Sequence, residues 1–236
     1  MKLINMFNDI SKNYDLINSI LSLGMDFNWR KKLVDLLKKK ILSQNNYINI
    51  LDLATGTGEL AFLLSKKFYR SNIIGLDPAN KMLKIAKKKL YKKKIKNISF
   101  INGNSCNIPF NDEYFDIITI SFGIRNFQHI HVSMKEIYRV LNPYGLLAIL
   151  EFSIPSNIFI KKIYYYYNKI IVNTIGKLLS NNNYAYKYLC KSINSFYYYG
   201  NKMKKLLMYH NFNEISIKKL LFEIVSIYIS NKKCIY

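Results

Sequence analysis

The sequence predicts an α/β fold organised around a mostly parallel sheet. Between residues 48 and 152, five short runs rich in β-branched and apolar residues occur, and segments with apolar residues at helical spacing connect most of them. This alternation is typical of βαβ units with right-handed crossovers. After residue 210, two strand-like runs follow each other without a helix between them. They predict an antiparallel hairpin at the sheet edge.

The bounds of the elements follow from the apolar runs and from the turn residues between them. Parallel strands are expected at 48–53, 73–77, 98–101, 115–121 and 146–152, and the hairpin strands near 215–220 and 224–229. Helices are expected at 78–90, 134–141, 158–180, 185–194 and 201–209. Pro78 is placed in the first turn of its helix, where a backbone N–H is not needed.

Residues 1–45 precede the first strand and have a helical pattern. A first helix is expected to end at Gly24, and Asp26 is expected to cap a second one. Two interpretations remain open. The helices pack on the sheet edge, or they form a lid over a pocket, because Tyr14 and Asp15 place polar groups at a helix start.

The chain carries a formal net charge of +22, from 36 Lys and Arg against 14 Asp and Glu. Such a charge suggests nucleic acid or an anionic membrane as a partner. Here Lys, Ile, Asn and Tyr are all abundant, and these residues share AT-rich codons. A genome-wide base bias therefore explains the charge, and we expect no nucleic-acid partner. Several acidic residues instead gather at the predicted pocket edge, namely Asp52, Glu59, Asp77, Asp112, Glu113 and Asp116.

Neither a membrane span nor a metal site is expected. No run of 18 apolar residues occurs, and the N-terminus lacks the apolar region of a signal peptide. The three cysteines, Cys106, Cys190 and Cys234, have no metal-ligand or redox spacing, and a sparse, odd count suits a reducing cytosol. We therefore expect a cytoplasmic protein.

Residues 48–60 predict a buried strand, a tight glycine turn and the start of a helix. Gly56 and Gly58 can adopt positive φ and let a ligand approach the bare backbone. Strand, glycine loop and helix in this order form nucleotide pockets at the carboxyl edge of open α/β sheets. The spacing Gly56-x-Gly58-x-x-Ala61 also fits the dinucleotide fingerprint, with Asp77 as the acid that binds ribose.

The carboxylates around the loop distinguish between these ligands. Asp52 at the strand end and Glu59 after the loop favour a cationic ligand over a pyrophosphate, which prefers bare N–H groups. S-adenosylmethionine has a sulfonium, an ammonium and ribose hydroxyls, so it is the ligand we expect. NAD and an ordinary βα turn without a ligand are the alternatives.

Longer segments match a family of known enzymes. They are Met6-Phe7, Lys12-x-Tyr14-Asp15, 21–30, 51–58, 118–126, 138–145, 150–155 and 186–193. On these segments the chain resembles the ubiquinone/menaquinone biosynthesis C-methyltransferases, which are S-adenosylmethionine-dependent class I enzymes, and the match covers nearly the whole chain. Segments 122–126 and 186–193 are specific to the family, whereas 175–178 and 226–229 look most like its menaquinone branch in bacteroidete-type bacteria.

The resemblance implies a class I methyltransferase fold, which is Rossmann-like with a seven-stranded sheet. It also implies a single domain, residues 1–236, in three parts. Residues 1–45 are the N-terminal helical lid, residues 46–153 the cofactor-binding core, and residues 154–236 the substrate-side helices and C-terminal strands.

The family's cofactor contacts, carried over by position, fall on Thr57, Asp77, Asn104, Ser105 and Ser121, with Asp52 and Gly56 at the methionine portion. Asp77 can accept both ribose hydroxyls in charge-assisted hydrogen bonds. Asn104 and Ser105 can bond the adenine edge, and Ser121 ends its strand beside the methyl donor. Purely structural roles are the alternative, most of all for Ser105 and Ser121.

The reaction implied by the resemblance moves a methyl group to a ring carbon of demethylmenaquinol. The ring becomes a carbon nucleophile when an adjacent hydroxyl, with a pKa of about 10 as in tyrosine, loses its proton. Arg125 is the expected catalytic residue, because its guanidinium can stabilise a phenolate. Asn126 would bond the second oxygen, and Tyr14 and Tyr188 are expected beside the substrate. The alternative is that Arg125 only pairs with an acid such as Glu151.

Three histidines receive weaker expectations. His129 and His131 lie just beyond Arg125 and are considered as bases only because they are near it. His210 is expected at the surface, at a helix end.

Other candidate functions are methylation of the ubiquinone precursor 2-methoxy-6-polyprenyl-benzoquinol, methylation of RNA or of another small molecule, and cofactor binding without catalysis. No Asn/Asp-Pro-Pro-Tyr segment follows the fourth strand and no Pro-Cys pair occurs, which speaks against base methylation.

The polyprenyl tail of such a substrate resides in the bilayer. The lysine- and tyrosine-rich helix at 158–180 can therefore lie at the membrane interface, or it is a crossover helix packed on the sheet with solvated lysines. Peripheral contact with the inner membrane and a homodimer are two further hypotheses.

Overall fold

A seven-stranded sheet organises the computed structural model, which describes residues 2–41, 47–167, 188, 191–193 and 195–233. The strands are β1 (Ile48–Leu53), β2 (Ser71–Asp77), β3 (Ile98–Asn102), β4 (Phe115–Ser121), β5 (Leu141–Phe152), β6 (Phe212–Leu220) and β7 (Val225–Lys232). Their order is β3-β2-β1-β4-β5-β7-β6. The first five strands are parallel, and β7 pairs antiparallel with β5 and β6. The predicted parallel sheet with an antiparallel C-terminal hairpin is confirmed.

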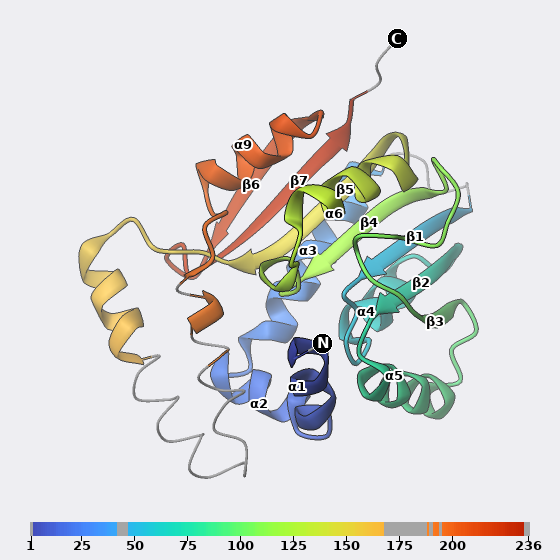
Figure 1. Cartoon of the computed structure of the whole chain (residues 1–236), viewed down its shortest axis with the longest axis horizontal. Helices are drawn as coiled ribbons and strands as arrows, with labels where there is room; N and C mark the ends of the chain where they lie inside the picture. Colours follow the sequence, from blue (N-terminus) through green and yellow to red (C-terminus); the bar gives the residue numbers. More distant parts are fainter. Residues whose placement is uncertain (1, 42–46, 168–187, 189–190, 194, 234–236) are drawn as a thin grey trace.

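Helices cover both faces of this sheet (Figure 1). They are α1 (Lys2–Ile10), α2 (Tyr14–Leu21), α3 (Met25–Lys40), α4 (Glu59–Lys67), α5 (Asn80–Lys93), the 3₁₀ turn η1 (Ile124–Asn126), α6 (Ile130–Val140) and α9 (Asn201–Tyr209). Apolar residues of α3, α4 and α5 form one core with the sheet, and those of α6 and α9 form a second core on the opposite face. The result is three layers, with the sheet in the middle.

The parallel strands are mostly apolar because both of their faces are covered. In β1, Ile50 belongs to the core under α3 and α4, whereas the next residue, Leu51, belongs to the core under α6. Side chains alternate between faces along a strand, so a strand buried on both sides needs apolar residues at consecutive positions. The predicted bounds of β1 and β4 therefore agree with the structure.

Several helix starts differ from the prediction. α5 begins at Asn80 rather than at Pro78, because Asp77 Oδ1 accepts the N–H of Ala79 at 2.8 Å and holds these residues in a turn. α6 begins at Ile130, four residues before the predicted start. Asp26 is not the cap of α3: Gly24, with φ of 72°, is the cap, and Asp26 lies in the first turn.

The region after β5 is described only in part. Residues 158–167 are helical, as predicted. The rest of the helix expected to residue 180, the segment 175–178 and most of the helix expected at 185–194 lie outside the described residues. Among the helices that the structure describes, none is both long and apolar enough to cross a membrane.

Candidate active site

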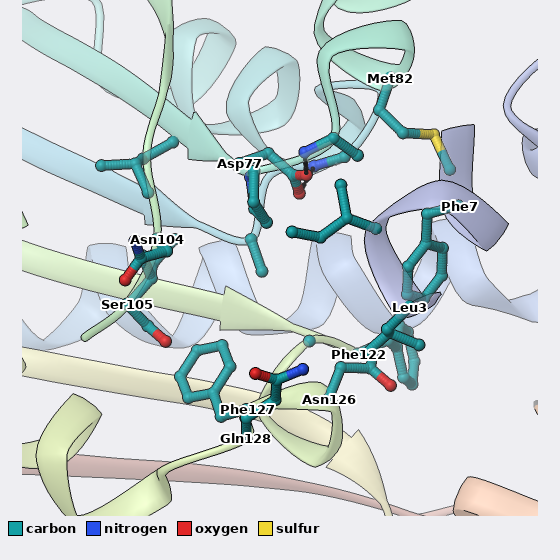
Figure 2. Close-up of a pocket in the computed structure, with 18 of the residues that line it drawn as sticks. Leu3, Phe7, Asp77, Met82, Asn104, Ser105, Phe122, Asn126, Phe127 and Gln128 are labelled. Carbon is teal, nitrogen blue, oxygen red and sulfur yellow. Dashed lines mark hydrogen bonds between the residues drawn. The ribbon is translucent and has the colours of Figure 1, made fainter. Parts of the chain in front are cut away.

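A cavity of about 380 Å³ opens at the carboxyl ends of β1, β2 and β4. The strand order reverses beside β1, and open α/β sheets bind ligands at such a switch point. Figure 2 shows Asp77, Asn104 and Ser105 along one wall, with Leu3 and Phe7 of α1 across from them. We call this space the cofactor cavity.

The backbone around the cofactor cavity is unusually tight. Gly58 has φ of 85°, and a Cβ there would lie 2.7 Å from Cζ of Phe100. Ala54 and Phe122, which follow β1 and β4, also have positive φ, 60° and 56°. Non-glycine residues in this region are strained, and such strain concentrates at functional sites. The two strand ends thus turn sharply away and leave room for a ligand.

Asp77 offers a carboxylate to the cofactor cavity. Its Oδ2 accepts the N–H of Gly56 at 2.9 Å, and its Oδ1 accepts that of Ala79. Burial raises the pKa of this carboxyl, while the two N–H donors oppose the rise. Each oxygen keeps a lone pair, so the carboxylate can accept further hydrogen bonds from ligand hydroxyls.

Asp52 lies below the glycine loop and is 1% exposed. Its Oδ2 accepts the hydroxyl of Thr55 at 2.6 Å, and its Oδ1 accepts that of Thr119 at 3.0 Å. Burial raises the pKa of Asp52 to about 6. It lines a small adjoining cavity together with Gly56, Ser121 and other residues of the loop region. A cation in that cavity would lower the pKa again.

Thr57 is held by the N-terminal helices. Its hydroxyl donates to Asp15 Oδ1 at 2.5 Å. Lys89 of α5 pairs with Asp15 and with Glu59, both at 2.6 Å. These contacts fasten the glycine loop to α2 and α5. Thr57 lines the small cavity rather than the cofactor cavity, so its side chain faces α2.

The three remaining predicted cofactor residues line the cofactor cavity. Asn104 Oδ1 accepts the N–H of Cys106 at 2.9 Å, and Ser105 shares a 2.7 Å hydrogen bond with Ser133 of α6. The hydroxyl of Ser121 is buried and has no hydrogen-bond partner among the described residues. A buried hydroxyl without a hydrogen-bond partner destabilises the fold. Because Ser121 lies between the two cavities, a ligand can supply the missing hydrogen bond.

Arg125 forms a buried ion pair. Its side chain is 4% exposed, and Nη1 contacts Glu151 Oε1 at 2.7 Å. The same nitrogen donates to the carbonyl of Phe122. The pairing with Glu151 that was considered as an alternative is therefore present. Arg125 does not line the cofactor cavity but a neighbouring one of about 600 Å³. Its catalytic role stays a prediction.

The other residues expected beside the substrate lie in or near η1. Asn126 lines the cofactor cavity, and the hydroxyl of Tyr188 donates to its Oδ1 at 3.1 Å. Tyr188 itself lines the neighbouring cavity with Arg125. Tyr14 lines both the cofactor cavity and the small one, and burial raises the pKa of its phenol.

His210 caps the C-terminal end of α9 as predicted, but the prediction that it lies at the surface is wrong. It is 5% exposed, and its Nε2 lies 2.9 Å from Nδ1 of His131. Burial and the nearby His131 lower the pKa of His210. His131 is also 3.3 Å from the hydroxyl of Tyr198, while His129 lines the cofactor cavity. Two residues 79 positions apart meet because α9 and α6 share one face of the sheet, which helix-end spacing does not reveal.

Sequence reasoning expected a helical lid at residues 1–45 but did not name the residues of α1 that line the site. Leu3 and Phe7 line the cofactor cavity, and Phe7 packs edge-on against Tyr14 with ring centroids 6.1 Å apart. Their spacing of four places them on one helix face, which was the available signal.

Comparison with known proteins identifies the family. The model of the ubiE/COQ5 methyltransferase family matches residues 1–232. The chain belongs to the ubiE/COQ5 methyltransferase family. It is 37% identical over 228 residues to a demethylmenaquinone methyltransferase of Bacteroides fragilis, which covers 96% of this chain and 91% of that protein. A demethylmenaquinone methyltransferase of Thermotoga maritima is 40% identical over 229 residues, or 97% and 95% of the two chains.

Family membership makes the chain a methyltransferase, and solved structures agree on its fold. A SAM-dependent methyltransferase from Aquifex aeolicus superposes with a TM-score of 0.60 at 16% identity, over 84% of this chain and 88% of that one. A Haemonchus contortus N-methyltransferase, solved with S-adenosylhomocysteine, reaches 0.64 at 14% identity over 86% of this chain and 53% of that one. The class I methyltransferase fold is confirmed.

Proposed function

We propose that this chain is an S-adenosylmethionine-dependent C-methyltransferase that converts demethylmenaquinol to menaquinol. The observation that carries the proposal is that Asp77, Asn104, Ser105 and Ser121 line one cavity in a chain 37% identical, over 96% of its length, to a demethylmenaquinone methyltransferase. When bound, S-adenosylmethionine supplies an activated methyl group on a sulfonium.

The residues around the cofactor cavity suit this cofactor. Asp77 accepts ribose hydroxyls, and Asn104 and Ser105 bind the adenine edge. The hydroxyl of Ser121, which has no partner within the described part of the chain, lies at the end of β4, where it meets the methionine part. The backbone of Gly56 also adjoins this part.

Two further loop residues support the same assignment. Asp52 contributes negative charge, since its pKa of about 6 leaves it mostly ionised at neutral pH, and this charge attracts the ammonium and sulfonium. Thr57 fixes the loop through its bond to Asp15.

The substrate quinol needs an environment that favours its phenolate. The buried guanidinium of Arg125 is permanently charged, and its Nε has no partner among the described residues. Glu151 holds it in place. We propose that Arg125 stabilises the phenolate and that Asn126 bonds the second oxygen. Tyr14 and Tyr188 flank the ring. Arg125→Ala is expected to keep S-adenosylmethionine affinity and to lose methyl transfer. Turnover within a few-fold of wild type would exclude this role.

We propose a separate role for each of three parts of the chain. We propose a helical lid at residues 1–45, a cofactor-binding core at 46–153 and a substrate side at 154–236. The exposed Ile158, Phe159 and Ile163 flank the adjacent Lys161 and Lys162. This pattern supports cytoplasmic residence with peripheral contact at the inner membrane, where lysines meet anionic lipid. A homodimer belongs to the same proposal and is checked by sedimentation.

One relative favours a second candidate substrate. A ubiquinone/menaquinone biosynthesis C-methyltransferase of Wigglesworthia glossinidia brevipalpis is 42% identical over 191 residues, covering 80% of this chain and 74% of that protein. The ubiquinone precursor is therefore the alternative to demethylmenaquinol.

The test compares substrates directly. Purified protein is incubated with labelled S-adenosylmethionine and, separately, demethylmenaquinol, the ubiquinone precursor quinol and tRNA. We expect the highest kcat/KM with demethylmenaquinol and no labelled tRNA. Labelled methyl groups found on tRNA alone would contradict the proposal. So would the absence of label on both quinols when the protein binds S-adenosylmethionine.

A further inference from the structure

A further, strongly apolar cavity of about 480 Å³ lies beside the cofactor cavity. We call it the apolar cavity. Its wall includes Leu21 of α2, Trp29 of α3, Phe152 at the end of β5, Ile163 and Ile193. None of the described residues that line it carries a charge. Its volume falls in the range of about 300–1,000 Å³ that is typical of small-molecule pockets, so it is a binding space rather than a flat patch.

Aromatic side chains separate this cavity from the reacting end of the site. The ring of Phe122, which lines the cofactor cavity, lies 6.1 Å from Trp29 and 4.8 Å from Phe152 between centroids. The guanidinium of Arg125 lies over the ring of Phe152, with its Cζ 5.4 Å from the ring centroid. Phe122 itself has the strained φ of 56°. The apolar cavity thus shares a wall with both the cofactor cavity and the proposed phenolate site.

The far end of the apolar cavity opens among exposed apolar residues. Leu23, Ile163 and Phe222 line it and are 67%, 68% and 71% exposed. An occupant that begins at a polar reacting group and ends at this rim must be apolar along its length. The apolar rim can also accommodate an occupant that extends beyond the cavity. These requirements describe a lipid chain attached to an aromatic ring.

We propose that the apolar cavity holds the ring-proximal part of the isoprenoid chain of the quinol, with Phe122 as the partition between chain and cofactor. The inference rests on the proposed function, because that function supplies a substrate with such a chain. The apolar cavity then discriminates tailed from tail-less quinols and directs the remaining chain toward the exposed rim.

Trp29 makes binding directly measurable. It is the one tryptophan of the chain and is 7% exposed in the cavity wall. Its fluorescence is titrated with farnesol, an isoprenoid alcohol without a quinol ring, in wild type, Leu21→Glu and Leu16→Glu. Leu21 lines the apolar cavity, whereas Leu16 lies on the same helix, is 53% exposed and does not line the cavity. The control therefore adds the same charge outside the cavity.

We expect a saturable change in wild type and Leu16→Glu, and at least about tenfold weaker farnesol binding in Leu21→Glu, because a charge is costly in an apolar space. S-adenosylmethionine affinity should be retained in all three proteins, which shows that they are folded. No saturable change in wild type, or equal binding in Leu21→Glu, would overturn the proposal. A third outcome would also overturn it. If sedimentation showed that wild type is a dimer and that Leu21→Glu is a monomer, a second copy of the chain would be the occupant that covers the cavity.

A turnover measurement separates this proposal from the proposed function. The ratio of kcat/KM for prenylated to tail-less demethylmenaquinol should exceed about tenfold in wild type and fall toward one in Leu21→Glu. Equal ratios in both proteins would refute the tail site while leaving the methyltransferase function intact. Farnesol binding without turnover of any quinol would refute the function instead.

Discussion

Asp52→Asn tests the electrostatics of the site in the most quantitative way. The wild-type carboxylate is 1% exposed and, within the described residues, accepts hydrogen bonds from two neutral hydroxyls, those of Thr55 and Thr119. Its pKa rises from 3.8 to about 6 in the folded chain. A shift of roughly two pH units corresponds to about 3 kcal/mol of unfavourable interaction for the ionised form.

The sign of this effect fixes the pH dependence. The folded chain binds the Asp52 proton more tightly than the unfolded chain does, so the protonated carboxyl stabilises the fold below about pH 4. That stability is lost as the pH rises through the folded pKa of about 6. Asparagine does not titrate. The unfolding free energy of Asp52→Asn relative to wild type should therefore increase by about 3 kcal/mol between pH 4 and pH 7.

Urea unfolding at both pH values measures this difference, and other titrating groups cancel in the comparison. Asp9→Asn serves as a control, because Asp9 is 57% exposed and loses the same charge. Cofactor binding should behave in the opposite way. S-adenosylmethionine should bind wild type more tightly as the pH rises from 5 to 7 and should bind Asp52→Asn weakly at both values. Parallel stability profiles for wild type and Asp52→Asn would refute the reasoning.

Three further substitutions probe separate features. Asp77→Ala should weaken S-adenosylmethionine binding by at least about tenfold in calorimetry, because charge-assisted hydrogen bonds contribute about 1.5–3 kcal/mol each; unchanged affinity would remove Asp77 from the site. Gly58→Ala should lower the unfolding free energy by about 1–3 kcal/mol in urea, since its Cβ would lie 2.7 Å from Phe100 and its φ is 85°; a shift under about 0.5 kcal/mol would show that the loop relaxes freely. Glu151→Gln should lower the unfolding free energy by about 3 kcal/mol or more, because it leaves the buried Arg125 without its negatively charged partner. An unchanged midpoint of urea unfolding would contradict this.

The sheet was largely predictable from the sequence, and its strongest elements show why. The bounds of β1 and β4 agree because strands covered on both faces carry apolar residues on both of these faces, so their runs are rich in apolar residues and end at turn residues. The start of α5 differs because Asp77, which was expected to serve the ligand, also holds the turn before the helix. Helix starts depend on such local hydrogen bonds, which residue spacing does not show.

The position of the proposed site residues beside a cavity was predictable, but most of their hydrogen-bond partners were not. The loop carboxylates and Ser121 do lie around two adjoining cavities. The contact of Thr57 with Asp15, 42 residues away, depends on the packing of distant elements. The pairing of Arg125 with Glu151, in contrast, was one of the alternatives expected from the sequence. The apolar cavity was not foreseen, since its wall combines α2, α3 and the end of β5. Contacts of this kind exist only once the chain is folded.

A crystal structure with S-adenosylhomocysteine would test most directly whether the cofactor cavity is the methyl-donor site. We predict the ribose hydroxyls within hydrogen-bond distance of Asp77, the adenine beside Asn104 and Ser105, and the sulfur near Ser121. S-adenosylhomocysteine bound elsewhere, or in this cavity with its ribose away from Asp77, would contradict the proposed site.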